Sequence, residues 1–422
     1  MSTAVVTAAS PTTGQPLTLP SRASATHLPS FDHPSQPQQQ QLLFQPRCEE
    51  GVTYSKENHG TVHYRFYLPH AISVAVAPVK VHLVKRGGCI VPMASIGVAV
   101  PMTRQQDGVW VGTMFAPVGL QCVVLMVDGS PVLTPHLSIG YLHGLQRANY
   151  VDVPPSNPKV CIYAPRSSVE HGTVAHNYVT SFTMDTIEEV LIYVPPSYHK
   201  AGSATRRYPV LYLLHDDREQ AICCVQQGKV NVIADNLIAS GAMREMIIVM
   251  KSSVCSSPDG ECLPYDTARM CEDLTEDIIP YIDNHYRTEA DRDNRAIAGL
   301  CMGSVQASRL CMTRHDLFAY AGVFSGLLHT SWSGTGADDD HIDALRSDPE
   351  AFQASMKVLF RCIGDGDTLR PLFKADDALL AELGVACERR VYTGSNSWQV
   401  WRQAAADFLP MLFKDLNSPS RR

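Results

Sequence analysis

Hydrophobic and polar positions follow two different patterns along this chain. Between about residues 51 and 155, short β-prone runs alternate apolar with polar or small residues and are separated by turn signals such as Asp107-Gly108 and Asp128-Gly129. Strands that recur every 8–12 residues with Asp-Gly turns are typical of a β-sandwich. The runs expected to be strands are His63–Tyr67, Ala71–Ala77, Lys80–Val84, Val109–Phe115 and Val123–Val127.

After Pro154-Pro155 the pattern changes to apolar runs that alternate with stretches of helical period. A helix is expected over Val230–Ser240, ending near Gly241, and another over Cys271–Tyr286, where apolar residues recur every four positions. Alternating strands and helices predict a mostly parallel sheet covered by helices. The expected strands are Val190–Val194, Tyr208–Leu214, Met246–Met250, Arg295–Ala298, Val358–Ile363 and Glu388–Tyr392.

Composition adds an N-terminal tail to these two regions. The first 50 residues are rich in Ser, Thr, Pro and Gln, which predicts disorder. The expected organisation is therefore a disordered tail over 1–50, a small β-sandwich over 51–155 and an α/β domain over 165–416. A length of 422 residues fits two folded units.

Charge and cysteine content exclude several classes of partner. The net charge is −7 and no basic run exceeds a dipeptide, which argues against nucleic-acid binding. No apolar stretch is long enough to span a membrane, and residues 1–30 lack a secretory signal. The 13 cysteines include no C-x-x-C spacing. No metal and no other cofactor is therefore expected. Reduced thiols in a cytoplasmic protein are the simplest interpretation.

One segment has the context of a nucleophile. The expected strand Arg295–Ala298 runs into Gly299-Leu300-Cys301-Met302-Gly303 and then into a helical stretch from Ser304 to Met312. Strand, tight turn and helix are the setting of a nucleophile elbow, with Cys301 at its tip and the Met302 N–H facing an oxyanion. The alternative is a small buried thiol at a tight strand–helix junction.

From about Val190 to Phe413 the chain resembles an esterase family of α/β-hydrolases that includes enterochelin, feruloyl and acetylxylan esterases. The region before it resembles the immunoglobulin-like early-set module that often precedes such esterases, chiefly at Asp107-Gly108-Val109-Trp110. The resemblance implies an α/β-hydrolase fold and action on carboxylic esters, with a small-molecule or glycan-linked acyl ester as substrate. The matching esterase segments are Tyr208–His215, Asp235–Ile238, Ala296–Gly303, Asp316–Tyr320, Phe324–Gly326, Gly364–Asp367 and Trp398–Arg402.

The chain departs from this family at three catalytic positions. Cys301 stands where the family has its serine, and Asn396 stands where the family has its histidine. The family's oxyanion loop begins His-Gly, whereas here it reads His215-Asp216. The resemblance leaves Asp367 as the retained acid.

These replacements predict weak or lost hydrolysis. A thiol is roughly a few per cent thiolate at pH 7 and can accept an acyl group without a base. Asn396 cannot take a proton from the water that must then hydrolyse the thioester, and an inward Asp216 carboxylate would oppose a developing oxyanion. Two alternatives stay open: a non-catalytic protein that binds a ligand or partner protein, and an acyltransferase. His329, and less so His215 and His341, are candidates for a relocated base. The sequence does not specify an oligomeric state.

Overall fold

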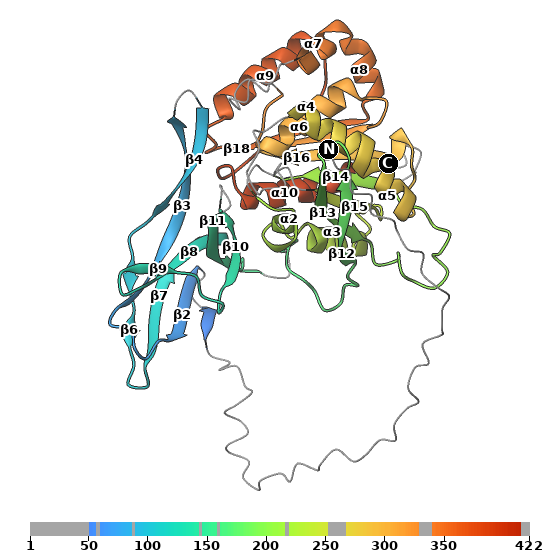
Figure 1. The fold of residues 1–422 in the computed structure, drawn as a ribbon. Helices are drawn as coiled ribbons and strands as arrows, with labels where there is room; N and C mark the ends of the chain where they lie inside the picture. The colour runs from blue at the N-terminus through green and yellow to red at the C-terminus, as the bar shows by residue number, and fades with distance from the viewer. Residues whose placement is uncertain are drawn as a thin grey trace, which may run out of the picture. The chain divides into compact units, whose positions relative to one another are not determined.

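The computed structural model describes residues 50–55, 60–86, 89–142, 146–157, 161–215, 219–251, 267–328 and 340–414. The expected tail over 1–50 lies almost entirely outside these ranges. Residues Glu49–Arg422 form one compact unit, which contains antiparallel sheets in its N-terminal part and an α/β region after them (Figure 1).

The N-terminal part contains two antiparallel sheets. The four-stranded sheet has the order β1-β2-β7-β6, and the seven-stranded sheet has the order β10-β11-β8-β3-β4 with β5 paired to β3 and β9 to β8. The bounds are β1 Gly51–Tyr54, β2 Thr61–Tyr67, β3 Val74–Arg86, β4 Cys89–Ile96, β5 Val100–Pro101, β6 Thr103–Arg104, β7 Val109–Phe115, β8 Gly119–Val127, β9 Ser130–Val132, β10 Ser138–Leu142 and β11 Gln146–Val153.

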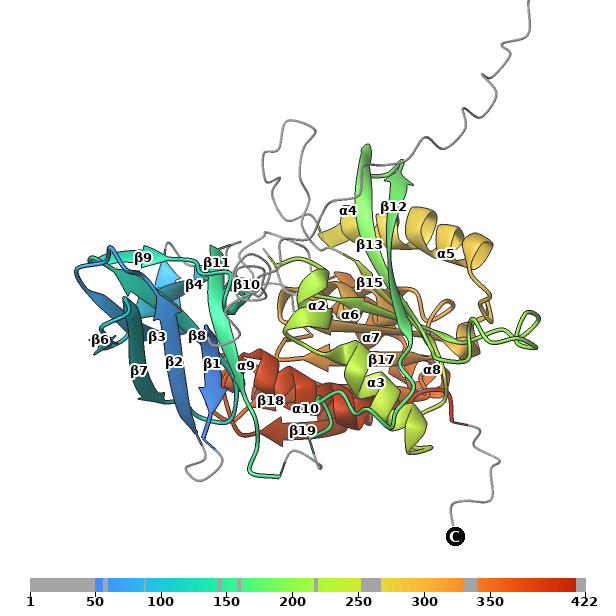
Figure 2. The same ribbon diagram turned by 90° about the horizontal axis from the view of Figure 1, so that it is seen from below.

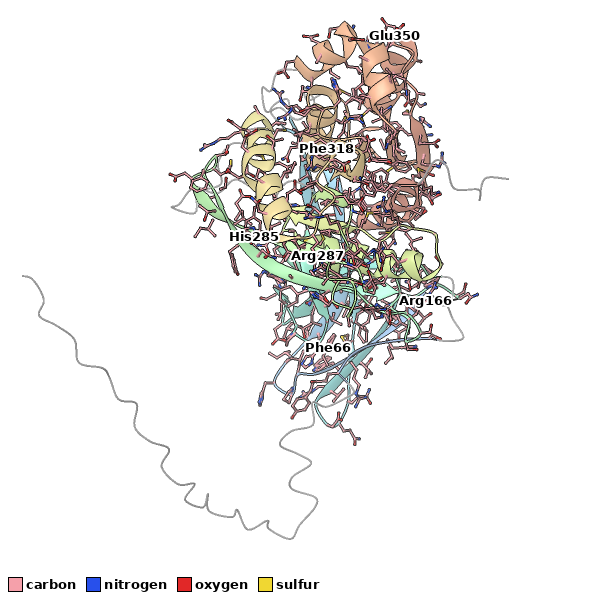
Figure 3. All side chains as sticks on the ribbon, turned by 90° about the vertical axis from the view of Figure 1, so that its right-hand side faces the viewer. Phe66, Arg166, His285, Arg287, Phe318 and Glu350 are labelled. Carbon is pink, nitrogen blue, oxygen red and sulfur yellow. The ribbon has the colours of Figure 1, made fainter. Side chains whose placement is uncertain are left out.

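These sheets share a hydrophobic core of their own. Tyr64, Phe66 and Trp110 are buried in it, and the Trp110 indole N–H donates to the Leu68 carbonyl at 3.0 Å. Figure 3 labels Phe66 in this core and Phe318 in the core of the α/β region. The sequence was expected to give two strands over 71–84, and this was wrong: β3 runs without a break from Val74 to Arg86 because its ladder with β8 continues directly into its ladder with β4.

The α/β region is built on an eight-stranded sheet of order β12-β13-β15-β14-β16-β17-β18-β19. The five strand pairs from β15–β14 to β18–β19 are parallel, and the two pairs at the β12 edge are antiparallel. Its strands are β12 Thr173–Ser181, β13 Thr186–Val194, β14 Val210–Leu214, β15 Ile247–Lys251, β16 Arg295–Leu300, β17 Tyr320–Phe324, β18 Val358–Gly364 and β19 Glu388–Tyr392.

Helices cover both faces of this sheet (Figures 1 and 2). One face packs against α2 Ile222–Gln226, α3 Val230–Ala239 and α10 Trp398–Phe408. The other packs against α4 Thr267–Asp273, α5 Ile279–His285, α6 Met302–Thr313, α7 Asp340–Ser347, α8 Pro349–Ser355 and α9 Arg370–Glu382. Strands buried on both faces explain the near-continuous apolar runs in the sequence, and the α/β class expected from them is confirmed.

Two expected helices are present, one with a difference. Helix α3 ends at Ala239, and Gly241 follows with a φ of +71°, as a C-terminal glycine cap requires. The helix expected over 271–286 starts earlier, at Thr267, and contains a π-helical turn, Leu274–Ile278, between α4 and α5. Pro280 lacks the N–H that a regular α-helical ladder needs, which favours such a local change.

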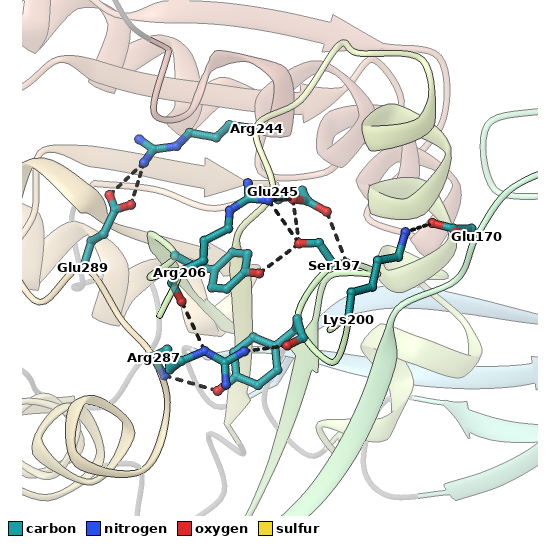
Figure 4. A network of polar contacts seen from close by, with 10 residues as sticks. Glu170, Ser197, Lys200, Arg206, Arg244, Glu245, Arg287 and Glu289 are labelled. Atoms are coloured by element: carbon teal, nitrogen blue, oxygen red, sulfur yellow. Dashed lines mark hydrogen bonds and ion pairs between the residues drawn. The ribbon is translucent and has the colours of Figure 1, made fainter. Parts of the chain in front are cut away.

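A polar network fixes the loop between β13 and β14 at the amino end of the central strand (Figure 4). Ser197 Oγ bonds Tyr208 Oη at 2.9 Å and Glu245 at 2.8 Å, and Arg206 pairs with Glu245 at 2.5 Å. The Arg287 guanidinium donates to the Tyr198 carbonyl and lies 3.8 Å from the centroid of the Tyr198 ring. The opposite, carboxyl end of the sheet carries the candidate nucleophile.

Candidate active site

Cys301 lies at a sharp turn between β16 and α6. Its φ of 49° and ψ of −109° are unusual for a residue with a side chain, and such conformations cluster at functional sites. Two backbone contacts hold this geometry: the Cys301 N–H donates to the Phe324 carbonyl at 2.8 Å, and the Cys301 carbonyl accepts from the Ser304 N–H at 3.1 Å. The turn is therefore a nucleophile elbow in its backbone geometry.

The two glycines of the elbow are required by close backbone contacts. A Cβ on Gly299 would lie 2.0 Å from the Gly303 carbonyl oxygen. A Cβ on Gly303 would lie 2.5 Å from the His215 carbonyl oxygen and 2.6 Å from that of Leu214. Only glycine lets the start of α6 approach both its own strand and the end of β14.

Asn396 contacts the sulfur of the candidate nucleophile. Its Nδ2 donates to Cys301 Sγ at 3.1 Å, across 95 residues of sequence. Asn396 belongs to the loop that leads into α10, and its Oδ1 is buried without a hydrogen-bond partner among the described residues. The sequence-predicted pair of nucleophile and base position is thus brought together.

Asp367 lies in the loop after β18 and is only 5% exposed. Its Oδ1 accepts the Leu369 N–H at 2.9 Å, whereas its Oδ2 is buried and has no hydrogen-bond partner within the described ranges. Burial raises the pKa of this carboxyl to about 6, and the Leu369 hydrogen bond lowers it by less. A buried carboxylate without a cationic partner explains this direction.

The loops of Asp367 and Asn396 are tied to each other. The Gly394 N–H donates to Asp365 Oδ1 at 2.9 Å, and the Gly366 N–H donates to the Gly394 carbonyl at 2.8 Å. The two loops also approach closely at Gly364, where a Cβ would lie 2.3 Å from the Gly394 carbonyl oxygen. Asp367, the acid that the resemblance predicts, and Asn396 therefore lie on adjoining loops, and each has one buried oxygen that no described residue satisfies.

This arrangement limits the chemistry of the site. An amide N–H can stabilise negative charge on sulfur, but an amide has no lone pair basic enough to take a proton at neutral pH. Asp367 meets no imidazole at position 396 that it would orient. The geometry places a hydrogen-bond donor beside Cys301 Sγ and no general base at position 396.

The remaining predicted residues divide into described and undescribed ones. Met302 is the first residue of α6, where backbone N–H groups point out of the helix end. His215 is fully buried at the end of β14, and His341 is buried with its Nε2 2.7 Å from the Leu328 carbonyl oxygen. Asp216 and His329 lie outside the described residues.

Three residues support the elbow in a way that the sequence did not indicate. Ser304 Oγ donates to the Cys301 carbonyl, and Phe324 accepts the Cys301 N–H. A Cβ on Gly326 would collide with Ser304 Oγ. The segment Phe324–Gly326 matches the family pattern. The hydrogen bond from the Cys301 N–H to the Phe324 carbonyl, however, involves only backbone atoms, so residue types do not reveal it.

The described residues supply neither a metal cluster nor a membrane span. No group of three His, Cys, Asp or Glu within them is arranged to hold a metal ion. None of their helices is both long and apolar enough to cross a bilayer.

Known proteins resemble this chain over different lengths. A protein from Xylanibacter ruminicola described as "Endo-1,4-beta-xylanase/feruloyl esterase" is 28% identical over 375 residues, which are 87% of this chain and 47% of that protein. This chain thus spans about half the length of that relative.

Solved structures give a similar result. A ferulic acid esterase is 26% identical with a TM-score of 0.50, covering 57% of this chain and 97% of that one. A ferulic acid esterase from Anaeromyces mucronatus has a TM-score of 0.53 at 21% identity, with 60% of this chain and 95% of that one covered. The enterobactin esterase of Shigella flexneri has a TM-score of 0.56 at 14% identity over 86% and 96%, which is a likeness of fold alone.

The sequence profile of a family described as "Putative esterase" matches residues 181–412, which contain β16, the elbow and the loops of Asp367 and Asn396. That range is more than half of the chain and includes the parallel part of the sheet. The chain belongs to this esterase family.

Proposed function

We propose that this protein binds carboxylic esters and that Cys301 accepts their acyl group as a thioester, which is then hydrolysed slowly or not at all. The observation that carries the proposal is the 3.1 Å contact between Asn396 Nδ2 and Cys301 Sγ. It puts a hydrogen-bond donor that cannot act as a base beside the nucleophile.

The proposed reaction has two unequal halves. The Cys301 thiolate attacks the ester carbonyl carbon, a C–S bond forms, the C–O bond to the alcohol breaks, and the alkoxide takes a proton from water. The N–H of Met302, and any other donor at this helix end, stabilises the oxyanion. Hydrolysis then requires water to lose a proton as it attacks the thioester, and Asn396 offers no acceptor for it.

The identity of the ester is proposed from the relatives. Proteins named as feruloyl and ferulic acid esterases match this chain, one of them at 28% identity. We therefore expect an acyl ester of the feruloyl or enterochelin type, either as a small molecule or linked to a glycan.

The domain division is part of the proposal. The antiparallel part over 51–155 has one core, and the α/β region over 165–416 has cores on both faces of its sheet. This supports an immunoglobulin-like early-set domain followed by an α/β-hydrolase domain. Nine cysteines among the described residues are free thiols, which supports a cytoplasmic location.

The test is acylation of the intact chain by p-nitrophenyl acetate and by a feruloyl ester. We expect a burst of about one equivalent of nitrophenol followed by slow or no turnover, with mass spectrometry locating one persistent acyl group on Cys301. Cys301→Ala should abolish both the burst and the adduct, and Cys387→Ala, which removes a half-buried thiol elsewhere, should change neither. Rapid turnover that depends on Cys301 would contradict the proposed slow or absent hydrolysis. Failure to label Cys301 would mean that its thiol has a structural role only.

A non-catalytic binding role is the second candidate. It is favoured by the two buried oxygens, Asp367 Oδ2 and Asn396 Oδ1, which no described residue satisfies and which a bound ligand could. Binding of a non-hydrolysable ester analogue without any acylation of Cys301 would support it. Product formation that depends on an added alcohol or amine would instead support acyl transfer.

A further inference from the structure

The edge of the seven-stranded sheet is held by a side chain from the α/β region. Gln227, which follows α2, binds the backbone of Tyr141 in β10. Its Oε1 accepts the Tyr141 N–H at 2.9 Å, and its Nε2 donates to the Tyr141 carbonyl at 3.0 Å. The Tyr141 hydroxyl donates to Gln220 at 2.8 Å. A Cβ on Gly140 would lie 2.7 Å from the Gln227 amide, so the approach is close. Tyr141 thus forms hydrogen bonds with both ends of the segment 220–227.

Helix α10 is attached to the same part of the molecule. Arg402, whose side chain is 1% exposed, donates through both terminal nitrogens to Asp152 at 2.9 and 2.8 Å and through Nε to the Gln227 carbonyl at 2.8 Å. Gln399, three residues nearer the site, donates to the Val118 carbonyl at 2.6 Å. The fork of a guanidinium fits this bidentate contact, and an ammonium would not.

These contacts involve the two segments that lead to the surroundings of Cys301, namely residues 220–227 and helix α10. The segment 220–227 follows the loop that begins at His215, whose carbonyl lies against Gly303. Helix α10 begins at Trp398, and Asn396 lies in the loop directly before it. A shift of α10 therefore moves Asn396 relative to Cys301, which is fixed independently by β16 and the Phe324 carbonyl.

We propose that Arg402 and Gln227 are positioning residues that make the antiparallel sheet a structural part of the active site. Arg402 sets the distance from Asn396 to Cys301 Sγ through α10. Gln227 holds the segment that follows the expected oxyanion loop. This inference rests on the proposed acylation of Cys301. It adds that the rate of acylation depends on contacts with residues 118–152.

The experiment compares two thiol reagents on the full chain. Acylation by p-nitrophenyl acetate depends both on the thiolate beside Asn396 and on stabilisation of the oxyanion, whereas alkylation by iodoacetamide depends on the thiolate alone. Asp152→Ala should slow acylation of Cys301 by about 10-fold or more, because misplacement near 1 Å has effects of that size. Alkylation should slow by a smaller factor than acylation, because it loses only the thiolate stabilisation, and Asp152→Glu should restore much of the acylation rate.

Two further variants keep the test decisive if Asp152→Ala unfolds. Gln399→Ala removes a single exposed hydrogen bond and should slow acylation in the same direction by a smaller factor. Gln403→Ala is the matched control, since the side chain of this exposed neighbour on α10 donates to the Gln399 carbonyl within its own helix. Acylation that stays at the wild-type rate in Asp152→Ala and Gln399→Ala, whatever happens to the melting temperature, would overturn the inference.

The outcome is separable from that of the proposed function. If the wild-type chain takes no acyl group, acylation at Cys301 is wrong, and positioning is then judged by amide hydrogen exchange over residues 395–400. Faster exchange there in Asp152→Ala and Gln399→Ala but not in Gln403→Ala supports the positioning role. Unchanged exchange in all three variants refutes it.

Discussion

At the scale of single residues, the backbone of Cys301 is held in a conformation that residues with a Cβ rarely adopt. The cost of such a conformation is about 1–3 kcal/mol and must be offset by surrounding contacts. The Phe324 carbonyl and the glycines at positions 299 and 303 supply the contacts and the space. The elbow therefore has no room for a side chain at either glycine.

We expect Gly303→Ala to destabilise the protein by about 3 kcal/mol, because the new Cβ would collide with the Leu214 and His215 carbonyl oxygens. Gly202→Ala is the comparison, since that glycine has a φ of +88° but no atom within 4 Å. Its cost should be about 1 kcal/mol, from backbone conformation alone. Urea unfolding measures both, and equal losses would contradict a steric role for Gly303.

Asp367 provides a prediction about pH. Its pKa is raised from 3.8 to about 6, so between those values the folded chain binds a proton that the unfolded chain has released. This group therefore makes the free energy of unfolding fall as pH rises from about 4 to 6, and the loss persists above pH 6. The effect is at most about 3 kcal/mol.

Asp367→Asn keeps an acceptor for the Leu369 N–H and removes the ionisation. We expect this variant to be more stable than the wild type at pH 7.5 and of similar stability near pH 4, as measured by urea unfolding. A difference that is constant over this pH range, or that favours the wild type at pH 7.5, would contradict burial of an unpaired carboxylate.

At the scale of elements, a buried ion cluster joins the sheet to the helix layer. Lys251 at the end of β15 lies 2.8 Å from Glu188 of β13 and 2.8 Å from Asp273 of α4, and all three are at least nine-tenths shielded from solvent. The Ser181 hydroxyl adds a hydrogen bond to Asp273. Burying one cation against two carboxylates is tolerable only while all three charges are present.

Lys251→Met should accordingly reduce the free energy of unfolding by about 3–5 kcal/mol, since it leaves Glu188 and Asp273 buried without their cation. The matched change is Lys357→Met, which removes a more exposed pair with Asp293 at 3.2 Å and should cost less than about 1 kcal/mol. Thermal or urea unfolding of the two variants is the measurement. Similar effects at both positions would show that the Lys251 cluster contributes no more than a surface pair.

At the scale of the whole molecule, a double substitution tests whether the chain binds an ester near Cys301. The double variant Cys301→Ser with Asn396→His puts the family's nucleophile and base on the present scaffold. An imidazole at 396 would lie on the loop adjoining that of Asp367, whose Oδ2 has no partner within the described residues. We expect p-nitrophenyl acetate hydrolysis at least about 10-fold above each single variant, because triad members act as a unit.

The single variants are the controls for this experiment. Asn396→His alone tests whether a thiol nucleophile turns over once a base is present, and Cys301→Ser alone should be inactive because a hydroxyl needs that base. A double variant that folds but hydrolyses p-nitrophenyl acetate no faster than the single variants would mean that more than the residues at 301 and 396 prevents hydrolysis. The second candidate, binding without catalysis, would then be preferred.

The sequence by itself determined the class of each region. A period of two with Asp-Gly turns predicts the antiparallel strands, and long apolar runs predict the strands buried between helices, because side-chain patterning depends only on local geometry. It also determined the residue types at the elbow, since glycine, cysteine and glycine between a strand and a helix permit few other conformations. The resemblance in sequence also led to the prediction that a cysteine and an asparagine stand where the family has its serine and histidine.

Only the tertiary structure decided how distant residues meet. The 3.1 Å distance from Asn396 Nδ2 to Cys301 Sγ depends on how α10 packs. Arg402 of α10 binds Asp152, which is 250 residues away in the sequence. The raised pKa of Asp367 and the continuity of β3 depend equally on packing and on strand pairing. Local sequence carries no signal for such contacts, because the free energy of burial and of long-range hydrogen bonds is set by partners that only the fold brings near.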